Sequence, residues 1–253
     1  DLEDAGWEVD FELEVPESMR SGVYAARLRA DESEGGEDYL PFFVRPKKGT
    51  STAPILFLAP TASYLAYANA HYMDSPKFRD GIYNVVGKEV AFPAQAQDKY
   101  IVDNGLQSLY DRHTDGSGVF YSSSLRPIAN MRPKYYWPRT LFTDGLDAHS
   151  HQFSADLYLL DWMEEKGFEF DVATDEDLNF EGADLLAPYP VLVTGSHPEY
   201  WSSQMLDAVE TYLSNGGRFM YMGGNGLYWV TSFDPMRPHV VEVRRWHGSG
   251  AYE

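Results

Sequence analysis

The chain has 253 residues, enough for one large domain or for a medium domain with a small neighbour. Its 39 acidic and 20 basic residues give a formal net charge of −19. This balance excludes a nucleic-acid-binding surface, which needs clustered Lys and Arg, and makes an anionic membrane an equally poor partner. The 6 Trp, 18 Tyr and 14 Phe argue for a folded chain, and the absence of Cys excludes disulfides, thiolate metal sites and cysteine nucleophiles.

The two ends of the sequence indicate an excerpt from a longer protein. Residues 1–4 (Asp-Leu-Glu-Asp) match neither a signal peptide nor a natural start, and residues 248–253 contain no amphipathic closing element. No apolar run approaches the roughly 18 residues of a membrane helix. We expect a cytoplasmic protein whose last domain is truncated at the C-terminus.

Residues 1–47 have the alternation of β-strands. Apolar side chains at every second position from Trp7 to Leu13 indicate one strand. A second strand begins at Val23, after the turn Ser21-Gly22, and a third runs from Tyr39 to Val44. Three strands alone would be a marginal domain, so we expect these residues to be the terminal strands of a β-sandwich.

Residues 48–253 have the pattern of an α/β domain. Four apolar runs predict buried strands, at residues 55–59, 168–173, 190–195 and 218–222. One helix is predicted to begin at Ser154 as its N-cap and to end before Gly167, with an inward face of Leu157, Leu160 and Met163. A second runs from Ser202 or Ser203 to Leu213, with the inward residues Met205, Leu206, Val209 and Leu213. This order predicts a mainly parallel sheet flanked by helices, whose ligands lie beyond the carboxyl ends of its strands.

The strongest candidate site follows the strand at 190–195. Residues 195–201 (Gly-Ser-His-Pro-Glu-Tyr-Trp) hold His197 and Glu199 in a defined relation around a proline. Both residue types serve as metal ligands and as acid or base groups. In the alternative interpretation, Glu199 faces a helix N-terminus and His197 caps the strand.

Weaker candidates follow other strands. Asn225 lies in a glycine-rich stretch (residues 223–226) that lets a backbone approach a ligand closely, although a plain turn explains it equally well. Tyr67 follows the first buried strand, and Tyr121 lies in a loop-rich region; for both, packing in the core or at its rim is the alternative. Asp175 opens a stretch with the spacing of a calcium loop but without its Gly and Glu, which favours a helix-capping turn.

Together these segments resemble the large (β) subunit of N,N-dimethylformamidase and its relatives over most of the chain. His197-Pro198-Glu199-Tyr200-Trp201-Ser202 is the most specific match, followed by Gly224-Asn225 with Tyr228-Trp229. The other matching segments are Trp7 to Val44, Pro60-Thr61 with Ala66-Tyr67 and Asn69, Ser123 to Pro127, Trp162 to Leu178, and Arg244-Arg245-Trp246. Ala68 between Tyr67 and Asn69 departs from the family pattern, as does the lack of a glycine pair after Asn69, which leaves the substrate open.

The resemblance implies a mononuclear ferric (Fe³⁺) site in a fold related to glutamine-amidotransferase-like domains. Its ligands in the family are two Tyr phenolates and one Glu carboxylate. Carried over, Glu199 is the carboxylate and Tyr67 one phenolate; Tyr121 is the second, with Tyr135 or Tyr136 as substitutes. His197 would be an acid or base beside the metal, and Asn225 a substrate or oxyanion contact.

We therefore expect an iron-dependent hydrolase of a small N-substituted amide. Iron would polarise the amide carbonyl and activate water. The partners expected are the small-molecule substrate, other copies in an oligomer, and a small partner subunit. The alternatives are a metal-free binding or scaffold domain, carbohydrate-directed through its β-sandwich, and a hydrolase that uses a different metal.

Overall fold

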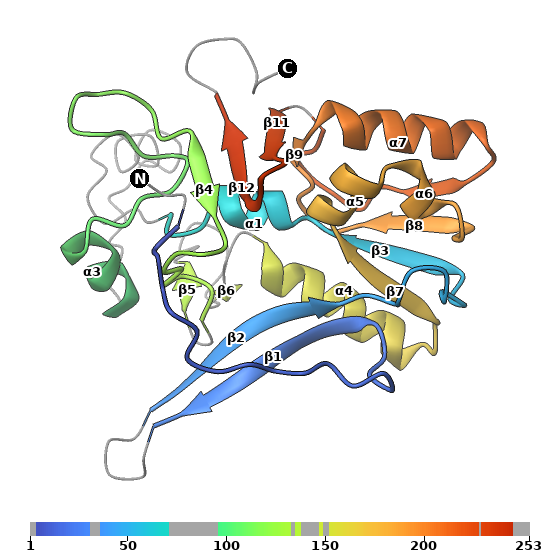
Figure 1. Ribbon diagram of the computed structural model, residues 1–253, viewed down its shortest axis with the longest axis horizontal. Coiled ribbons are helices and arrows are strands. Elements are labelled where there is room, and N and C mark those ends of the chain that lie inside the picture. Colours follow the sequence, from blue (N-terminus) through green and yellow to red (C-terminus); the bar gives the residue numbers. More distant parts are fainter. Residues whose placement is uncertain are drawn as a thin grey trace, which may run out of the picture.

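The computed structural model describes residues 4–30, 36–70, 96–132, 135–137, 147–148, 152–227 and 229–244. Its centre is a four-stranded sheet whose neighbouring strands are all parallel, in the order β10-β8-β3-β7 (Figure 1). The strands are β3 (Ile55–Ala59), β7 (Phe170–Thr174), β8 (Val191–Thr194) and β10 (Arg218–Met220). Each overlaps a predicted strand, so the presence of all four is confirmed. The prediction that the strand at 218–222 is buried is wrong, because β10 lies at the edge of the sheet and its Arg218 and Met220 are exposed. The relation to glutamine-amidotransferase-like domains stays a prediction.

Helices cover both faces of the sheet (Figure 1). Leu56 and Leu58 of β3 pack with α5 (Asp175–Glu181), α6 (Ala183–Leu186) and α7 (Ser203–Ser214). Phe57 and Ala59 point to the opposite face and pack with α4 (Phe153–Glu165). The alternation of side chains along a strand explains how one continuous apolar run supplies both layers.

The predicted helices are present, but their inward faces are partly different. α4 begins at Phe153 with Gln152 as N-cap, so the prediction of Ser154 as N-cap is wrong. Leu160 and Met163 are buried as predicted, whereas Leu157 is 36% exposed. The N-cap Ser202 accepts a hydrogen bond from the Met205 N–H and begins α7.

The buried face of α7 is formed by a partly different set of residues from the one predicted. Met205 and Val209 are buried as predicted, but Leu206 and Leu213 are exposed, and Ala208 and Tyr212 take their place. The cause lies outside the helix: the Tyr212 hydroxyl donates to the Tyr189 carbonyl oxygen, 3.0 Å away. The ring packs over Gly217, where a Cβ would lie 2.3 Å from the Tyr212 ring.

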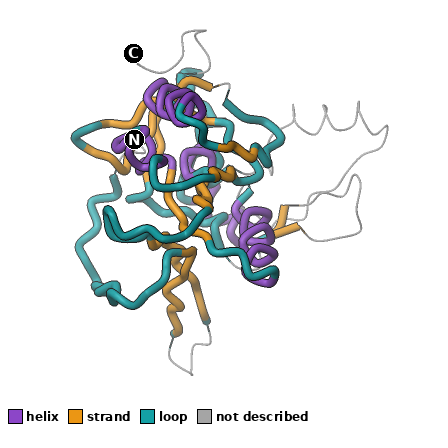
Figure 2. Tube along the Cα trace, turned by 90° about the vertical axis from the view of Figure 1, so that its right-hand side faces the viewer, coloured by secondary structure: helices purple, strands orange, loops and turns teal. Residues whose placement is uncertain are grey.

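The N-terminal region forms an antiparallel hairpin of β1 (Gly22–Arg29) and β2 (Glu37–Val44), which extends away from the sheet (Figures 1 and 2). The Ser21 hydroxyl accepts from Val172 N–H of β7 and donates to the Val44 carbonyl, which ties the base of the hairpin to the sheet. The predicted strand between Trp7 and Leu13 is wrong for this structure. A strand needs a neighbour for its hydrogen bonds, and within the described residues this segment pairs with none; Trp7 is 63% exposed.

A second, mixed sheet lies at the carboxyl ends of β3 and β8, beside α1 (Thr61–Ala66) (Figure 1). Its order is β4-β12-β11-β9. The strands are β4 (Tyr121–Ser123), β9 (Tyr200–Trp201), β11 (Trp229–Asp234) and β12 (Arg237–Val243). Outside these sheets lie α3 (Ala96–Asp103) and the pair β5 (Tyr136–Trp137) and β6 (Asp147–Ala148).

The stretch that begins at Asp175 is a helix start. Thr174 is the N-cap of α5, and its hydroxyl accepts from the Asp177 N–H while the Asp177 carboxylate accepts from the Thr174 N–H. This reciprocal capping confirms the helix-capping interpretation. Among the helices described, none has the length and apolarity needed to cross a membrane.

Candidate functional site

Two segments that follow neighbouring strands of the parallel sheet bring Tyr67 and Glu199 into contact. Tyr67 is the C-cap of α1, the helix directly after β3, and Glu199 follows β8. The Tyr67 hydroxyl donates a hydrogen bond of 2.8 Å to Glu199 Oε2. His197 Nε2 lies 2.9 Å from the same oxygen. All three side chains are at most 8% exposed, so the predicted Tyr67, His197 and Glu199 form one buried cluster.

Tyr110 and Tyr200 complete this cluster, and neither is among the site residues predicted from the sequence. The Tyr110 hydroxyl lies 2.5 Å from the Tyr67 hydroxyl and 2.5 Å from the Tyr200 hydroxyl. Its ring stacks on that of Tyr67 with 4.5 Å between centroids. Tyr200 is fully buried, whereas Tyr110 is 38% exposed and forms the side of the cluster that faces solvent.

Hydrogen bonds from the backbone set the position of Glu199. The Glu199 N–H donates to the Ser63 hydroxyl of α1 at 3.2 Å and to the His197 carbonyl at 2.9 Å, which makes a tight turn around Pro198. Before this turn, Gly195 passes so close to Pro60 that a Cβ would lie 2.5 Å from Pro60 Cδ. The requirement for glycine therefore comes from the close approach of the segments that follow β3 and β8.

Buried Asp156 of α4 supports the same turn from the opposite face of the sheet. Its Oδ1 accepts from the Ser196 N–H at 2.5 Å, and its Oδ2 accepts from the Tyr64 hydroxyl. Burial raises the pKa of Asp156, and the hydrogen bonds from Tyr64 and Ser196 oppose that shift.

The surroundings of Tyr67 keep its hydroxyl protonated. Burial, then the neighbouring Tyr200 and Tyr110, and finally Glu199, raise the pKa of Tyr67 above the ordinary tyrosine value. A phenol in this position keeps its proton unless a positive charge lies beside it. Two tyrosine oxygens and a carboxylate in contact are hard, oxygen-only donors, which suit a hard trivalent cation such as ferric iron. The residues present therefore fit the metal that the resemblance implies.

Within the described ranges, no group of three or more His, Asp or Glu is arranged to hold a metal ion. The contacts of Tyr67 with Glu199 and Tyr110 place two tyrosine oxygens beside a carboxylate.

The other candidate residues have different surroundings. The Tyr121 hydroxyl lies 3.3 Å from Arg244 Nη2 in the mixed sheet. Tyr135 is buried and donates to Asp98 Oδ1 at 2.9 Å. The side chain of Tyr136 lies outside what the structure describes.

The loop of Asn225 adjoins the His197 turn, because the Gly224 N–H donates to the Ser196 carbonyl at 3.0 Å. The Asn225 side chain itself is exposed. Its predicted role as a substrate or oxyanion contact stays a prediction.

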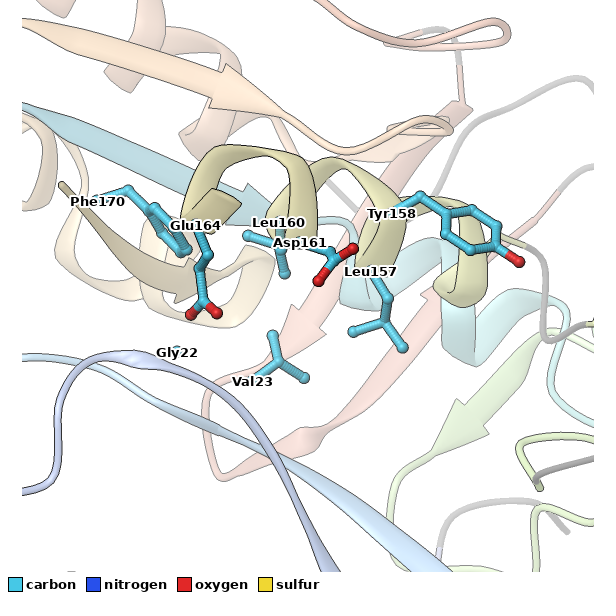
Figure 3. Close-up of a pocket in the computed structure, with 8 residues that line it drawn as sticks. All are labelled: Gly22, Val23, Leu157, Tyr158, Leu160, Asp161, Glu164 and Phe170. Atoms are coloured by element: carbon cyan, nitrogen blue, oxygen red, sulfur yellow. The ribbon is translucent and has the colours of Figure 1, made fainter. Parts of the chain in front are cut away.

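The larger cavities among the described residues have other linings. One of about 390 Å³ lies between the start of β1 and α4; Asp161 and Glu164 extend from α4 toward Val23 (Figure 3). The other, of about 820 Å³, lies between β2, α1 and the segment 124–132, with Thr61 and Arg126 in its wall. Neither cavity is lined by Tyr67, His197 or Glu199.

No periodic pattern could have found Tyr110. It lies in a turn within the loop-rich middle of the chain, where apolar residues have neither helical nor strand spacing. Tyr200 directly follows Glu199 within the matching segment 197–202, so its proximity to the site could be inferred from the sequence.

The molecule thus combines a parallel α/β sheet with a buried tyrosine–carboxylate–histidine cluster at the carboxyl ends of its strands. The family model described as N,N-dimethylformamidase beta subunit-like, C-terminal, matches residues 1–251, and the chain belongs to this family. It is 44% identical over 258 aligned positions to an N,N-dimethylformamidase beta subunit of Alcaligenes sp. and 43% identical to one of Paracoccus aminophilus. Each alignment covers 100% of this chain and 31% of the relative, so the chain spans about a third of these proteins.

Proposed function

We propose that this chain carries the metal site of a hydrolase that acts on a small N-substituted amide, with ferric iron held by Tyr67, Tyr110 and Glu199. The observation that carries the proposal is the continuous contact of the Tyr110, Tyr67 and Glu199 oxygens, with His197 on the same carboxylate. The names of the two relatives support an amide of the formamide type as the substrate.

The second tyrosine ligand in this proposal is Tyr110 in place of Tyr121. Tyr110 lies within hydrogen-bond distance of Tyr67, whereas the Tyr121 hydroxyl lies 3.3 Å from Arg244 Nη2 in the mixed sheet. Bound iron would act as a Lewis acid that polarises the amide carbonyl and lowers the pKa of water.

His197 supplies proton transfer in this proposal. A neutral imidazole that donates its Nε2 proton to Glu199 Oε2 has Nδ1 as its basic nitrogen. That nitrogen can take a proton from water and return it to the leaving amine. Tyr110 is the exposed member of the cluster, so substrate approaches from its side, while Tyr67 and Tyr200 exclude water from the other.

The proposal is tested on the intact protein expressed in iron-replete medium. Phenolate bound to ferric iron gives a visible charge-transfer band, so the protein should be coloured and contain stoichiometric iron. Glu199→Gln should lose iron while the fold persists, because the residue lies in a turn beyond β8. A colourless protein that contains ferric iron, or a Glu199→Gln variant with full iron, would contradict the site.

A matched pair of substitutions distinguishes the two candidates for the second phenolate. Tyr110→Phe and Tyr121→Phe each remove one hydroxyl and leave the ring. We expect Tyr110→Phe to weaken or shift the band and lower iron affinity, and Tyr121→Phe to leave both unchanged. The reverse result would restore Tyr121 as the ligand. A metal-free binding domain would show no iron in any of these proteins.

We also propose that the chain acts within an oligomer together with a small partner subunit. The support is that both relatives are named beta subunits. Size-exclusion chromatography with light scattering on the intact protein, alone and coexpressed with its partner, measures this directly. A monomer that is fully active alone would contradict it.

A further inference from the structure

Arg126 lies buried between the segments that carry Tyr67 and Tyr110. Only 5% of the residue is exposed. Its Nη1 donates to the Gln107 carbonyl at 2.7 Å, three residues before Tyr110. Its Nη2 lies 3.4 Å from the carbonyl of Ala68, the residue after Tyr67. One guanidinium group therefore contacts the backbone on both sides of the tyrosine pair.

The same guanidinium reaches α1 through a serine. Nη2 donates to the Ser122 hydroxyl at 2.9 Å, and that hydroxyl donates to the Leu65 carbonyl at 2.7 Å. The two tyrosine segments also meet directly, because the Leu109 N–H donates to the Ala66 carbonyl at 3.1 Å. Every acceptor in this set is a backbone carbonyl or a buried hydroxyl. Reaching all of them from one side chain requires the several N–H donors of a planar guanidinium group.

The residues that follow Arg126 hold the turn after Tyr67. Asn130 Nδ2 donates to the Tyr67 carbonyl at 3.0 Å, and Asn69 Nδ2 donates to the Pro127 carbonyl at 2.8 Å. The Ala129 N–H donates back to Asn69 Oδ1 at 2.8 Å. Asn69 has a φ of 62°, in the left-handed region, and these bonds hold it there.

A buried arginine destabilises the fold more than an apolar residue would, so filling space alone does not explain Arg126. Within the described part of the chain, no carboxylate lies within salt-bridge distance of it, and its Nε has no hydrogen-bond partner there. Burial lowers the pKa of Arg126 to about 10, so the group is still charged at neutral pH. A buried charge without an ion pair destabilises a fold relative to an apolar side chain of similar volume.

We propose that Arg126 is a positioning residue, which fixes the Tyr67 segment against the Tyr110 segment and so sets the spacing of the two hydroxyls. Its contacts with both segments are the observation that carries the proposal. The expected effect of Arg126 on iron affinity rests on the proposed function. Its expected effect on amide exchange in the Tyr67 and Tyr110 segments does not.

The first test measures amide hydrogen exchange on the iron-free intact protein. Arg126→Met keeps the volume and removes the donors, and Arg126→Lys keeps the charge and part of the donor set. We expect faster exchange in peptides that cover residues 65–70 and 104–111 for Arg126→Met and a smaller change for Arg126→Lys. Arg45→Met is the matched control, because Arg45 pairs with Asp177 and Glu181 of α5 and these ion pairs hold neither tyrosine segment, so both peptides should stay unchanged.

The second test measures iron affinity by chelator competition together with the phenolate band. Residues that orient metal ligands typically change affinity by 10- to 100-fold when replaced, so we expect a loss of at least ~10-fold for Arg126→Met, with the band shifted. Arg126→Lys should recover part of the loss, and Arg45→Met should bind iron as the unmodified protein does.

The outcomes separate this inference from the function on which it partly rests. Unchanged exchange in both peptides, or an Arg126→Met protein with unmodified affinity and band, overturns the positioning role even where the unmodified protein holds iron. Absence of iron from the unmodified protein overturns the proposed function, while the exchange comparison still decides the role of Arg126. If Arg126→Met does not fold, Arg126→Lys and Asn130→Ala supply the same comparison.

Discussion

Tyr200 extends the tyrosine pair to three hydroxyls in a row. Its hydroxyl lies 2.5 Å from that of Tyr110, and the residue is fully buried. In the proposed site Tyr110 is a phenolate, and a hydrogen bond to an ionised acceptor is shorter and stronger than one to a neutral acceptor. In the proposed site, Tyr200 would therefore adjust how strongly the Tyr110 oxygen donates to the metal.

Tyr200→Phe tests this adjustment. We expect the variant to keep its iron and to show a shifted visible band, with unfolding free energy lower by about 1 kcal/mol for the lost hydrogen bond. Tyr212→Phe is the control, since its buried hydroxyl donates to the Tyr189 carbonyl and takes no part in the hydrogen bonds among Tyr67, Tyr110 and Tyr200. It should lose comparable stability with no change in the spectrum. An unchanged band in Tyr200→Phe would contradict the role.

At the level of elements, the site depends on how closely the ends of β3 and β8 approach. A Cβ on Gly195 would lie 2.5 Å from Pro60 Cδ and 2.8 Å from Asp156 Oδ1. Neither neighbour can retreat easily, because Pro60 precedes α1 and Asp156 accepts from the Ser196 N–H. A side chain at this position would push the His197–Glu199 turn away from Tyr67.

Gly195→Ala should therefore lower both stability and iron content. Overpacking of this kind costs about 1–3 kcal/mol, measured as the free energy of unfolding in urea. Gly224→Ala is the matched control in the adjoining loop, where a Cβ would meet nothing within 4 Å. Its change should stay within about 0.5 kcal/mol. If both variants behave alike, the close approach at Gly195 does not matter for the site.

Strands that are buried on both faces could be predicted from the sequence. β3 and β8 are apolar runs covered on both faces, and such runs are recognisable without knowledge of their neighbours. The inward face of α7 was predicted incorrectly in part, because Tyr212 buries its ring over Gly217, a contact set by the strand that follows. The strand expected from Trp7 to Leu13 needs a partner strand that the local alternation does not reveal.

The same distinction applies to the site. His197 and Glu199 are two residues apart in one turn, so their proximity is local. Tyr67 was placed by resemblance, and its contact with Glu199 is a consequence of parallel strand order. Tyr110 lies in a loop with no periodic signal and reaches the cluster through contacts such as that of Arg126 with Gln107, which only the folded chain brings about.

On the scale of the whole molecule, some of the 39 acidic residues that give the net charge of −19 are buried. Asp156, Asp175 and Glu176 come together near the carboxyl ends of β3 and β7, and burial raises the pKa of each. Asp175 is fully buried: its Oδ2 accepts from the Ala62 N–H, and its Oδ1 has no partner among the described residues. For Asp175, burial is the largest cause, and repulsion from Glu176 adds to it.

Asp175 gives the stability a definite dependence on pH. Its pKa is raised in the folded state above the unfolded value of about 3.9, so between these two values the folded protein holds more protons than the unfolded chain. The free energy of unfolding contributed by this group is therefore unaffected below about pH 4 and falls as pH rises through the window, by up to about 1.4 kcal/mol per pH unit. Above the folded pKa the loss is complete and constant.

Asp175→Asn removes the ionisation and keeps an oxygen that can accept from the Ala62 N–H. Measured by urea unfolding of the iron-free intact protein from pH 4 to 8, its stability relative to the unmodified protein should rise with pH and then level off. Asp115→Asn should give a nearly constant difference from about pH 5 to 8, because hydrogen bonds from Ser117 lower the pKa of Asp115 and place its titration below this range. That group stabilises the fold above the unfolded pKa, and the contribution is lost only as pH falls through the lower, folded pKa. A stability difference for Asp175→Asn that stays constant over this range would show that Asp175 is not the source of the pH dependence.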